Sequence, residues 1–333
     1  MTAGLATRVL TADTETIGAA ARLIVDGGLV AFPTETVYGL GADATNGSAV
    51  AKLYAAKRRP SFNPLIAHVS DLAAARALAR FDNDAEGLAM AFWPGPLTLV
   101  VPKALGCPVA DLATAGLDTI AVRVPAHPVA RDLLAAVGRP IVAPSANRSG
   151  HVSPTKAEHV LADLAGRIDL VLDAGATTVG VESTIVGALG RATVLLRPGG
   201  LPRGDIERVL GRPLAEAPAR TASADHDEDG MLAPGMFASH YAPRTRLRLG
   251  ATDIRAGEAL LAFGPAPPNG AEQAIARRSL SERGDLVEAA SNLFSHLRAL
   301  DGAGAATIAV MPIPHEGLGE AINDRLTRAA APR

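Results

Sequence analysis

The stretch "GLVAFPTETVYGLG", residues 28–41, runs from an apolar segment directly into the polar triplet Thr34–Glu35–Thr36. An apolar run of this length, bounded by glycine and proline, is typical of a buried strand. Burying an unpaired polar group costs about 2–7 kcal/mol, so the hydroxyls and the carboxylate that follow the strand are expected to have polar partners or a ligand. We therefore interpret the end of this strand as the edge of a polar site.

The same combination of an apolar run and a polar side chain recurs up to residue 198. It is found for Lys57–Arg58–Arg59 in "YAAKRRP", His68 in "PLIAHV", Arg123 in "TIAVRVP", Ser145 and Asn147 in "IVAPSAN", Ser183 in "VESTIV" and Arg197 in "TVLLRPG". Each interruption alone has an ordinary structural explanation. Their recurrence at the ends of core-like strands predicts one shared pocket, which favours a small anionic ligand over a flat partner surface.

Periodicity predicts an α/β fold for the first two thirds of the chain. Strands are expected at 28–33, 65–69, 97–101, 119–124, 140–143, 169–172, 183–187 and 193–197, and helices at 14–26, 48–57, 70–80, 83–91, 127–137, 155–165 and 203–210. Strands that alternate with helices indicate layered α/β structure. The gap between 187 and 193 is too short for a helical crossover, so we expect a large, twisted mixed sheet with flanking helices.

Composition divides the chain into three parts. Residues 1–211 form a large first domain, residues 212–245 a linker rich in alanine and proline, and residues 246–333 a smaller, Rossmann-like α/β domain. In the small domain, apolar side chains recur at helical spacing at Leu286, Ala290, Leu293, Leu297 and Leu300, and again at Ile322, Leu326 and Ala329. The end of the linker predicts docking onto another surface, because it gathers Met236, Phe237, His240 and Tyr241.

The overall composition excludes several classes of protein. A content of 48% hydrophobic and 20% charged residues indicates a globular chain, and the net charge of -2 provides no general attraction to nucleic acid or to anionic membranes. A single cysteine, Cys107, excludes an internal disulfide and a cysteine-rich metal site. We find neither a long apolar span nor a secretion signal, so we expect a cytoplasmic protein. The common nucleotide, zinc-protease and serine-hydrolase motifs are also missing.

The strand at 119–124 shows how one charge enters an apolar element. Alternation places Ile120, Val122 and Val124 toward the core and Thr119, Ala121 and Arg123 on the other face. An arginine in that position is suited to hold a carboxylate or a phosphate in a bidentate manner. The alternative is a structural salt bridge with a nearby Asp or Glu.

The other polar residues also leave two interpretations open. "KRRP" is either a solvated helix end whose cations complement the helix dipole or a phosphate clamp with Asn63 as an amide donor. His68 is either a satisfied, partly buried strand residue or a ligand contact. "APSAN" is either an ordinary turn or a cradle in which Ser145 and exposed amides hold an anion.

Taken in order, these motifs resemble a known family. "FPTETVYGLG", "KRRPSFNPLIAHV", "WPGPLTLV", "AVRVPAHP", "APSANRSG", "ESTIV" and "LLRPGG" resemble the YrdC-like threonylcarbamoyl-AMP synthases. The "SHYAP" segment and the smaller second domain resemble the long, two-domain form. The resemblance implies a nucleotidyltransferase that converts L-threonine, bicarbonate or CO₂ and ATP to threonylcarbamoyl-AMP and diphosphate. The product would supply a separate transferase complex that modifies tRNA beside the anticodon.

The resemblance also implies roles for individual residues. L-Threonine is expected to contact Thr36, His68, Arg123, the backbone at Ala143, and Ser183. ATP is expected to contact Lys57, Arg59, Asn63, Thr119, Ser145, Ser153, Arg197 and, from a linker that caps the active site, Tyr241. Lys57 and Arg59 would stabilise the charge that develops during catalysis. Mg²⁺ would arrive on the ATP phosphates, with no metal ligands identified in the protein.

Three alternatives remain beside this interpretation. A non-catalytic RNA-binding module is disfavoured by the net charge and by the aromatic content of 3%. An enzyme of another class is conceivable because the implied fold resembles that of a sugar-phosphate-processing synthase, but clustered carboxylates are expected there and only Glu35, Asp43 and Glu182 lie near the motifs. A carbamoyl-phosphate-processing domain of a larger maturation enzyme is disfavoured by the lack of zinc-finger cysteines.

Overall fold

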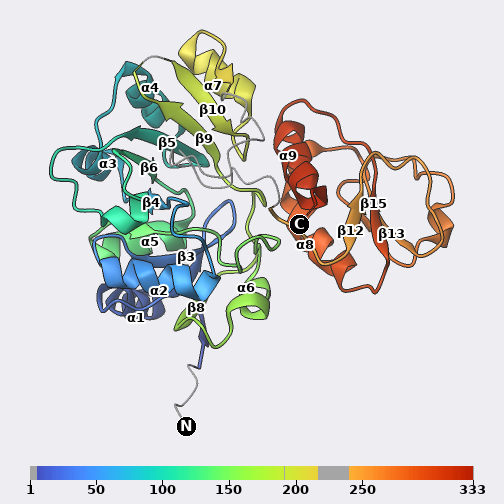
Figure 1. Cartoon of the computed structure of the whole chain (residues 1–333), viewed down its shortest axis with the longest axis horizontal. Coiled ribbons are helices and arrows are strands. Elements are labelled where there is room, and N and C mark those ends of the chain that lie inside the picture. Colours follow the sequence, from blue (N-terminus) through green and yellow to red (C-terminus); the bar gives the residue numbers. More distant parts are fainter. Residues whose placement is uncertain (1–5, 191, 217–239, 333) are drawn as a thin grey trace.

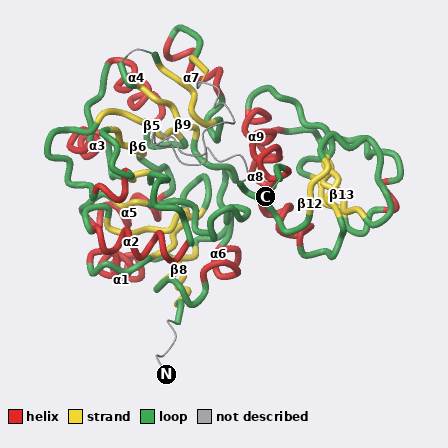
Figure 2. The backbone as a smooth tube through the Cα atoms, in the orientation of Figure 1, coloured by secondary structure: helices red, strands yellow, loops and turns green. Residues whose placement is uncertain are grey.

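The chain folds into two α/β domains that lie side by side (Figure 1). The computed structural model describes residues 6–190, 192–216 and 240–332. The large domain carries the N-terminal part of the chain and the small one the C-terminal part, and helices α8 and α9 of the small domain face the large one (Figures 1 and 2). The predicted fold class, a large mixed sheet with a smaller second α/β domain, is therefore confirmed.

An 11-stranded sheet forms the centre of the large domain, in the order β1-β8-β2-β3-β7-β4-β6-β5-β9-β10-β11. Its strands are β1 (Arg8–Thr11), β2 (Val30–Pro33), β3 (Tyr38–Asp43), β4 (Ile66–His68), β5 (Leu97–Pro102), β6 (Thr119–Arg123), β7 (Ile141–Val142), β8 (Leu170–Asp173), β9 (Thr184–Ala188), β10 (Thr193–Arg197) and β11 (Ala215–Glu216). Neighbours β9 and β10 are antiparallel whereas β4 and β6 are parallel. The sheet is mixed, as the short connection after residue 187 predicts.

Helices cover both faces of this sheet. They are α1 (Thr14–Val25), α2 (Gly47–Lys57), α3 (Leu72–Leu78), α4 (Asn83–Phe92), α5 (Pro128–Val137), α6 (Ala157–Leu164) and α7 (Arg203–Leu210), with a short 3₁₀ helix at Asp111–Thr114. Apolar side chains of α1 and α5 share one core with β2, and those of α2, α4, α6 and α7 share a second core on the other face. A small third cluster, Ile66, Val100, Ala121, Ile185 and Leu196, marks the sheet face beside the candidate site.

The small domain has a parallel four-stranded sheet in the order β12-β15-β13-β14. Its elements are β12 (Arg246–Arg248), β13 (Glu258–Ala262), a 3₁₀ turn at Ala271–Gln273, β14 (Arg277–Ser279), α8 (Leu286–Asp301), β15 (Thr307–Val310) and α9 (Leu318–Ala330). Helices α8 and α9 pack together on one face of the sheet. No strand is predicted from the sequence at β14, because its three residues lie at or near the surface and show no apolar alternation.

The two domains share apolar contacts. Val37, Val152 and Val181 of the large domain belong to the same buried cluster as the α8 and α9 side chains. Gly180, at φ +77°, lies so close to α8 that a Cβ atom there would come within 2.4 Å of the Ala290 carbonyl oxygen. Only glycine tolerates both this backbone angle and this approach. The arrangement of the domains is therefore fixed by direct backbone packing.

The predicted linker is only partly described by the structure. Ala215 pairs with β10, so the large sheet continues past the predicted boundary at residue 211. Met236 and Phe237 lie outside the described residues, and the three-part division of the chain stays a prediction. Among the described helices, none combines the length and the apolar character needed to cross a membrane.

Candidate active site

A small polar cavity of about 50 Å³ lies where several strands of the large sheet end. It is lined by Thr36, Val37, Arg59, Ile66, His68, Arg123, Ala143, Pro144, Ser145, Glu182, Ser183, Arg197, His240 and Tyr241. All five predicted threonine contacts are in this lining, and so are four of the eight predicted ATP contacts, Arg59, Ser145, Arg197 and Tyr241. The prediction of one shared pocket is confirmed, and the role of each residue in it stays a prediction.

Strand register brings the central residues together. Strands β4 and β6 run parallel with Ile66 opposite Ala121 and His68 opposite Arg123. The side chains at 120, 122 and 124 lie in the core, as alternation predicts. His68 and Arg123 therefore emerge side by side on the sheet face that carries the pocket.

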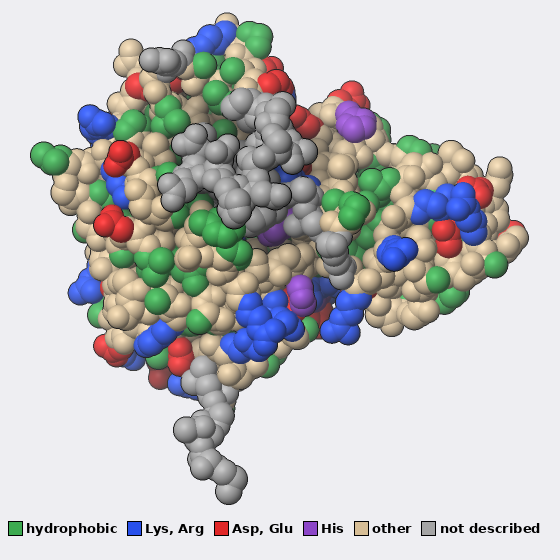
Figure 3. All heavy atoms as spheres, in the orientation of Figure 1, with side chains coloured by type: hydrophobic (Ala, Val, Ile, Leu, Met, Phe, Trp, Pro, Cys, Tyr) green, Lys and Arg blue, Asp and Glu red, His purple; other side chains and the backbone are tan. Residues whose placement is uncertain are grey.

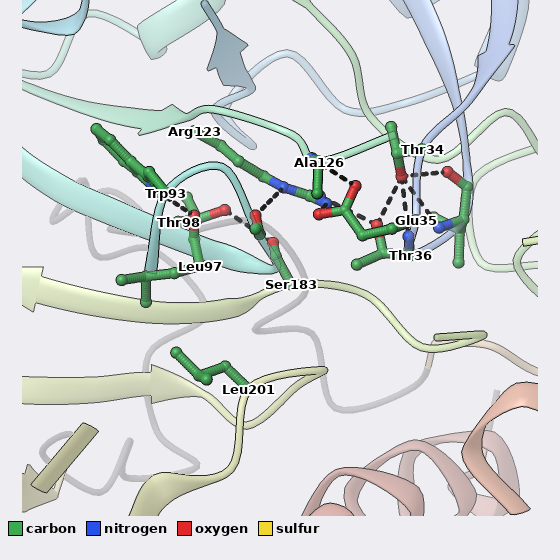
Figure 4. Close-up of polar contacts among 12 residues, drawn as sticks. Thr34, Glu35, Thr36, Trp93, Leu97, Thr98, Arg123, Ala126, Ser183 and Leu201 are labelled. Atoms are coloured by element: carbon green, nitrogen blue, oxygen red, sulfur yellow. Dashed lines mark hydrogen bonds and ion pairs between the residues drawn. The ribbon is translucent and has the colours of Figure 1, made fainter. Parts of the chain in front are cut away.

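Arg123 is held in place by three hydrogen bonds (Figure 4). Its Nη2 donates to Glu35 Oε1 at 2.7 Å, its Nη1 to Thr36 Oγ1 at 3.0 Å and its Nε to the Gly95 carbonyl at 3.2 Å. A guanidinium has five N–H groups, so two remain for a ligand. The two alternatives considered for this arginine are thus compatible: Arg123 forms a structural salt bridge and still faces the pocket.

Glu35 is a buried acid that the sequence analysis leaves without a role. Its Oε2 accepts the backbone N–H of Ala126 at 3.1 Å, while Oε1 faces Arg123. Burial alone would raise the pKa of this carboxyl group, but the charge and the hydrogen bond of Arg123 outweigh it, so the pKa lies below its usual value. Glu35 is therefore ionised at neutral pH and fixes the guanidinium.

The hydroxyl groups of the "PTET" turn complete this corner. Thr34 Oγ1 accepts the backbone N–H groups of Thr36 and Val37, at 3.2 and 3.3 Å, and lies 2.7 Å from Thr36 Oγ1. Such side-chain-to-backbone bonds are characteristic of serine and threonine turns. Thr34 thereby shapes the turn, whereas Thr36 lines the pocket and contacts Arg123.

His68 is a neutral acceptor at the wall of the pocket. Burial, followed by the charge of Arg123, lowers the pKa of its ring to about 3. Nδ1 lies 3.2 Å from the Ile66 carbonyl oxygen. A carbonyl only accepts, so Nδ1 carries the proton of the neutral ring and Nε2 keeps its lone pair.

Two further cationic side chains, Arg59 and Arg197, line the same cavity. Arg59 Nη2 donates to Asn63 Oδ1 at 2.5 Å, and Arg197 Nη2 donates to the Ser183 carbonyl at 2.9 Å. Burial and the charge of Arg197 lower the pKa of Arg59 to about 10. Like charges brought this close in a buried place indicate a site for an anion.

The "KRRP" segment divides its three cations among different tasks. Arg58 caps α2 in the left-handed conformation and is exposed, whereas Arg59 turns into the cavity. Lys57 is 1% exposed and donates from Nζ to the carbonyl oxygens of Ser145 and Asn147, both at 2.5 Å. Lys57 therefore supports the Ser145 loop from behind and does not line the cavity.

Three further predicted ATP contacts also lie outside the lining. Asn63 is buried and holds Arg59, with its own Nδ2 lacking a partner among the described residues. Ser153 is buried and donates to Glu182 Oε1 at 2.5 Å. Thr119 stands at the start of β6, at the opposite end of the strand from Arg123. Spacing along the sequence does not reveal this depth order, because neighbours in a motif can point to opposite sides of a loop.

Tyr241 closes the cavity from the side of the second domain. Its backbone has φ 61°, and its ring is 1% exposed and stacks on Phe294 at 5.7 Å between centroids. The next residue, Ala242, donates its N–H to the Gly150 carbonyl at 2.9 Å. Tyr241 Oη and His240 Nδ1 are buried and lack hydrogen-bond partners among the described residues.

Two buried charged residues beside the cavity were not predicted from the sequence as contacts. Glu182 lines the cavity and forms a 2.8 Å ion pair with Arg325 of α9. Arg325 falls between Ile322 and Leu326 on the apolar stripe of that helix, which places its charge on the buried face. A charge on an apolar stripe was the signal available in the sequence.

A larger cleft of about 390 Å³ continues along the junction of the domains. Residues 240–244 border both cavities in succession, and the cleft is also lined by Ser149, Gly150, His151, Asp163 and Arg298. Lys, Arg and His side chains gather around this junction on the face drawn in Figure 3. Within the described ranges, no group of three or more His, Cys, Asp or Glu side chains could hold a metal ion.

Known proteins resemble this chain over nearly its whole length. A family model described as "Telomere recombination" matches residues 22–199, and one described as "Threonylcarbamoyl-AMP synthase, C-terminal domain" matches residues 202–331. The threonylcarbamoyl-AMP synthase of Pyrococcus abyssi is 42% identical over 94% of this chain and 94% of its own. That of Bacillus subtilis is 40% identical over 95% of this chain and 93% of its own.

A solved structure agrees with these sequence matches. The crystal structure of P. abyssi Sua5 complexed with L-threonine has a TM-score of 0.85 and 38% identity, and it covers 98% of this chain and 97% of that one. Both domains are included in such a match. The chain belongs to the Sua5, YciO and YrdC family, in its two-domain threonylcarbamoyl-AMP synthase form.

Proposed function

We propose that this chain makes threonylcarbamoyl-AMP by holding threonine at Arg123 and the ATP phosphates at Arg59 and Arg197 of the same pocket. The observation that carries the proposal is that three arginine side chains line one small cavity. Arg123 is a fixed guanidinium with two uncommitted N–H groups, and Arg59 and Arg197 are two further cations in the same lining. Two anionic groups, a carboxylate and a phosphate chain, match this charge.

At the threonine end, the carboxylate pairs with Arg123 in a bidentate manner. The neutral His68 ring offers a lone pair to a hydroxyl or amine hydrogen, and Thr36 and Ser183 provide hydroxyls. Ser183 Oγ is already 2.7 Å from Thr98 Oγ1, so its position is fixed before a ligand enters. Threonine's amine takes up CO₂ with loss of a proton and becomes a carbamate.

At the phosphate end, a carbamate oxygen attacks the α-phosphorus of ATP. The new P–O bond forms as the bond to the diphosphate breaks, and negative charge moves onto the leaving group. Arg59 and Arg197 stabilise this charge electrostatically. Lys57 contributes through the Ser145 loop that its ammonium group supports.

Mg²⁺ belongs to this proposal as part of the MgATP substrate. Glu182 is the carboxylate that lines the cavity among the described residues, and it is committed to Arg325 and Ser153. The protein side chains therefore fit a metal that is carried by the phosphates rather than by a carboxylate cage. Bound there, Mg²⁺ would neutralise phosphate charge.

The size of the cavity requires Tyr241 to move. Ligand sites for small molecules enclose about 300–1,000 Å³, whereas this cavity encloses about 50 Å³. ATP would enter after residues 240 and 241 leave the cation cluster, and the ring would then close over the nucleotide. Closure would exclude water from the carbamate, which decomposes readily in solution.

The wider setting follows from the product. Threonylcarbamoyl-AMP would be consumed by a separate transferase complex that modifies tRNA beside the anticodon, in the cytoplasm. No observation favours the RNA-binding alternative over the synthase. The alternatives that need clustered carboxylates or zinc-finger cysteines are not supported by this cavity.

Diphosphate release tests the proposal. The protein is incubated with ATP, Mg²⁺ and bicarbonate, with and without L-threonine, and with L-serine as the control. Release that depends on threonine is the expected result. Release in no condition would reject the synthase function, and RNA binding would then be measured across salt concentrations.

A further inference from the structure

Arg325 of α9 is a fully buried arginine that reaches from the second domain to the pocket of the first. Its Nε donates to Glu182 Oε2 at 2.8 Å and its Nη1 to Asp324 Oδ2 at 2.5 Å. Its guanidinium carbon lies 5.0 Å from the centre of the Tyr241 ring. Both Glu182 and Tyr241 line the cavity, so one side chain contacts two of its walls.

The buried charge of Arg325 is stabilised by its neighbours. Removing an arginine from water is costly unless its partners are well placed. The charges of Glu182 and Asp324 and the nearby Tyr241 keep the pKa of Arg325 above its ordinary value although burial opposes this, so the cation is retained. Nη2 has no hydrogen-bond partner among the described residues. If α9 served only to pack against the large domain, a leucine at this position would avoid the free-energy cost of burying a charge.

Two other contacts from the second domain converge on the same segment. Phe294 of α8 stacks on the Tyr241 ring, and the carbonyl of Arg328 accepts the N–H of His240 at 3.2 Å. On its other side, Glu182 accepts the hydroxyl of Ser153. Arg325 is thus the one charged side chain, among those described, that connects the second domain with both Glu182 and Tyr241.

We propose that Arg325 is a positioning residue for the nucleotide end of the pocket, through which the second domain holds Glu182 and Tyr241 in place. The proposal rests on the proposed function for its kinetic consequence, but not for its structural one. Without Arg325, Glu182 becomes a buried carboxylate beside Arg197 with no partner from α9. The Tyr241 ring loses its cation contact and with it part of the force that seats the segment.

A second ion pair between the same two domains provides a matched control. Arg203 Nη2 of α7 lies 2.6 Å from Glu320 Oε1 of α9, and both side chains are partly exposed. Neither residue lines the cavity. Arg203→Met therefore removes an ion pair between α9 and the large domain, together with the contact of Arg203 to exposed Glu216, without touching Glu182 or Tyr241.

Hydrogen exchange of the full-length protein, read by mass spectrometry on a peptide that covers 240–244, tests the structural part. The amides of His240 and Ala242 report on the segment, because they donate to the Arg328 and Gly150 carbonyls. Arg325→Met should speed exchange in this peptide by about tenfold or more, as expected when local opening becomes easier. Arg325→Lys should be intermediate, and Arg203→Met should match the wild type.

Two results would overturn the proposal. One is unchanged exchange in Arg325→Met; the other is equal acceleration in Arg325→Met and Arg203→Met, which would mean that general domain docking matters. If Arg325→Met does not fold, Glu182→Gln replaces it, since it removes the charge that Arg325 pairs with and keeps the shape. Unchanged exchange in Glu182→Gln would count against the proposal equally.

Kinetics test the functional part. In Arg325→Met the KM for ATP should rise about tenfold, equivalent to roughly 1.4 kcal/mol, with a much smaller change in the KM for threonine. Adding Arg325→Met to Tyr241→Ala should then cost less than it does alone. A wild-type protein without threonine-dependent diphosphate release would reject the proposed function, while the exchange experiment would still decide the role of Arg325.

Discussion

Glu35 and Arg123 form a buried ion pair in which the carboxylate is bonded on two sides and the guanidinium is not yet fully used. The Nη2 to Oε1 distance is 2.7 Å, and the side chains are 10% and 4% exposed. Because Glu35 is also anchored to the Ala126 N–H, the direction of Arg123 is set by the protein before any ligand arrives. A pre-oriented cation avoids the cost of ordering a flexible one on binding.

Replacing Glu35 by Gln should weaken threonine binding, although Glu35 itself is not an expected threonine contact. The amide keeps the shape but loses the charge that fixes Arg123, so the KM for threonine should rise about tenfold. In Arg123→Met the KM for threonine should rise further, by about 100-fold or more. Diphosphate release at varied threonine and saturating ATP measures both. An unchanged KM in Arg123→Met would reject this arginine as the carboxylate site.

Stability separates the ion pair from its role in binding. Arg123→Met leaves Glu35 as a buried carboxylate without its cation, which should cost about 3–5 kcal/mol of unfolding free energy. The double variant Glu35→Gln/Arg123→Met should recover much of that stability and none of the activity. Chemical denaturation of the three variants makes the comparison, and recovery of activity in the double variant would contradict it.

The unfolding free energy should fall as the pH is lowered below neutrality, partly through His68. Its pKa is lowered to about 3 in the folded state from 6.5, so between these values the unfolded chain binds a proton that the folded protein does not. The contribution is a loss of about 1.4 kcal/mol per pH unit below 6.5. His159, with its pKa lowered to about 4, acts in the same direction.

The comparison of wild type with His68→Gln isolates this residue. Urea denaturation between pH 7 and pH 5 stays above the range in which the Glu35 pair, whose carboxyl pKa lies below 4.5, begins to fail. The slope of unfolding free energy against pH should be smaller in the variant. Parallel slopes would show that the pKa of His68 is the same in the folded and unfolded states, and would reject the lowered pKa.

Lys57 and Arg59 should fail in different ways although they are two residues apart. Lys57→Met removes the donor to two buried carbonyls, so both stability and activity should fall, by about 1–3 kcal/mol per unsatisfied group in stability. Arg59→Met also removes hydrogen bonds, to Asn63 and Pro64, but it takes a cation out of the cavity lining as well, so it should raise the KM for ATP more than Lys57→Met does. ATP kinetics of the folded variants distinguishes them, and an equal rise of the KM for ATP in both would contradict the assignment.

The contributions of the Tyr241 hydroxyl and of the Tyr241 ring can be measured separately with two variants. Tyr241→Phe keeps the stacking on Phe294 and removes a buried hydroxyl that has no partner among the described residues, so stability should be unchanged or slightly higher. Tyr241→Ala should lose about 3 kcal/mol or more of packing. A higher KM for ATP in Tyr241→Phe alone would identify the hydroxyl as a nucleotide contact, and no change would limit the role of Tyr241 to its ring.

The spacing of apolar residues predicted most of the large domain, because most of its strands and helices show the periodicity of their secondary structure. The strand at 119–124 has apolar residues at 120, 122 and 124 on one face, and it was found where expected, as Thr119–Arg123. Three strands of the large sheet were not predicted, and one of them, β11 at Ala215–Glu216, lies in the segment that was expected to be a linker. All six residues of β3, Tyr38–Asp43, are buried and show no alternation, and β1, Arg8–Thr11, is an edge strand with mostly exposed side chains.

The composition of the pocket was predictable from the ordered motifs, but its depth was not. Arg59 and Arg123 were expected to meet a ligand and both line the cavity. Lys57 and Ser153 were expected there too and lie behind it, because their hydrogen bonds turn them toward Ser145 and Glu182. Which side of a loop a side chain takes depends on partners that are far away in sequence.

The sequence by itself determined the fold class, the family and most of the polar residues around one pocket, since these follow from local periodicity and from motifs in fixed order. Only the tertiary structure decided that Arg325 meets Glu182, 143 residues away along the chain, and that Tyr241 closes the cavity between them. Contacts of this kind depend on how two separately folded domains pack. That packing is set by shape at places such as Gly180, and no local pattern records it.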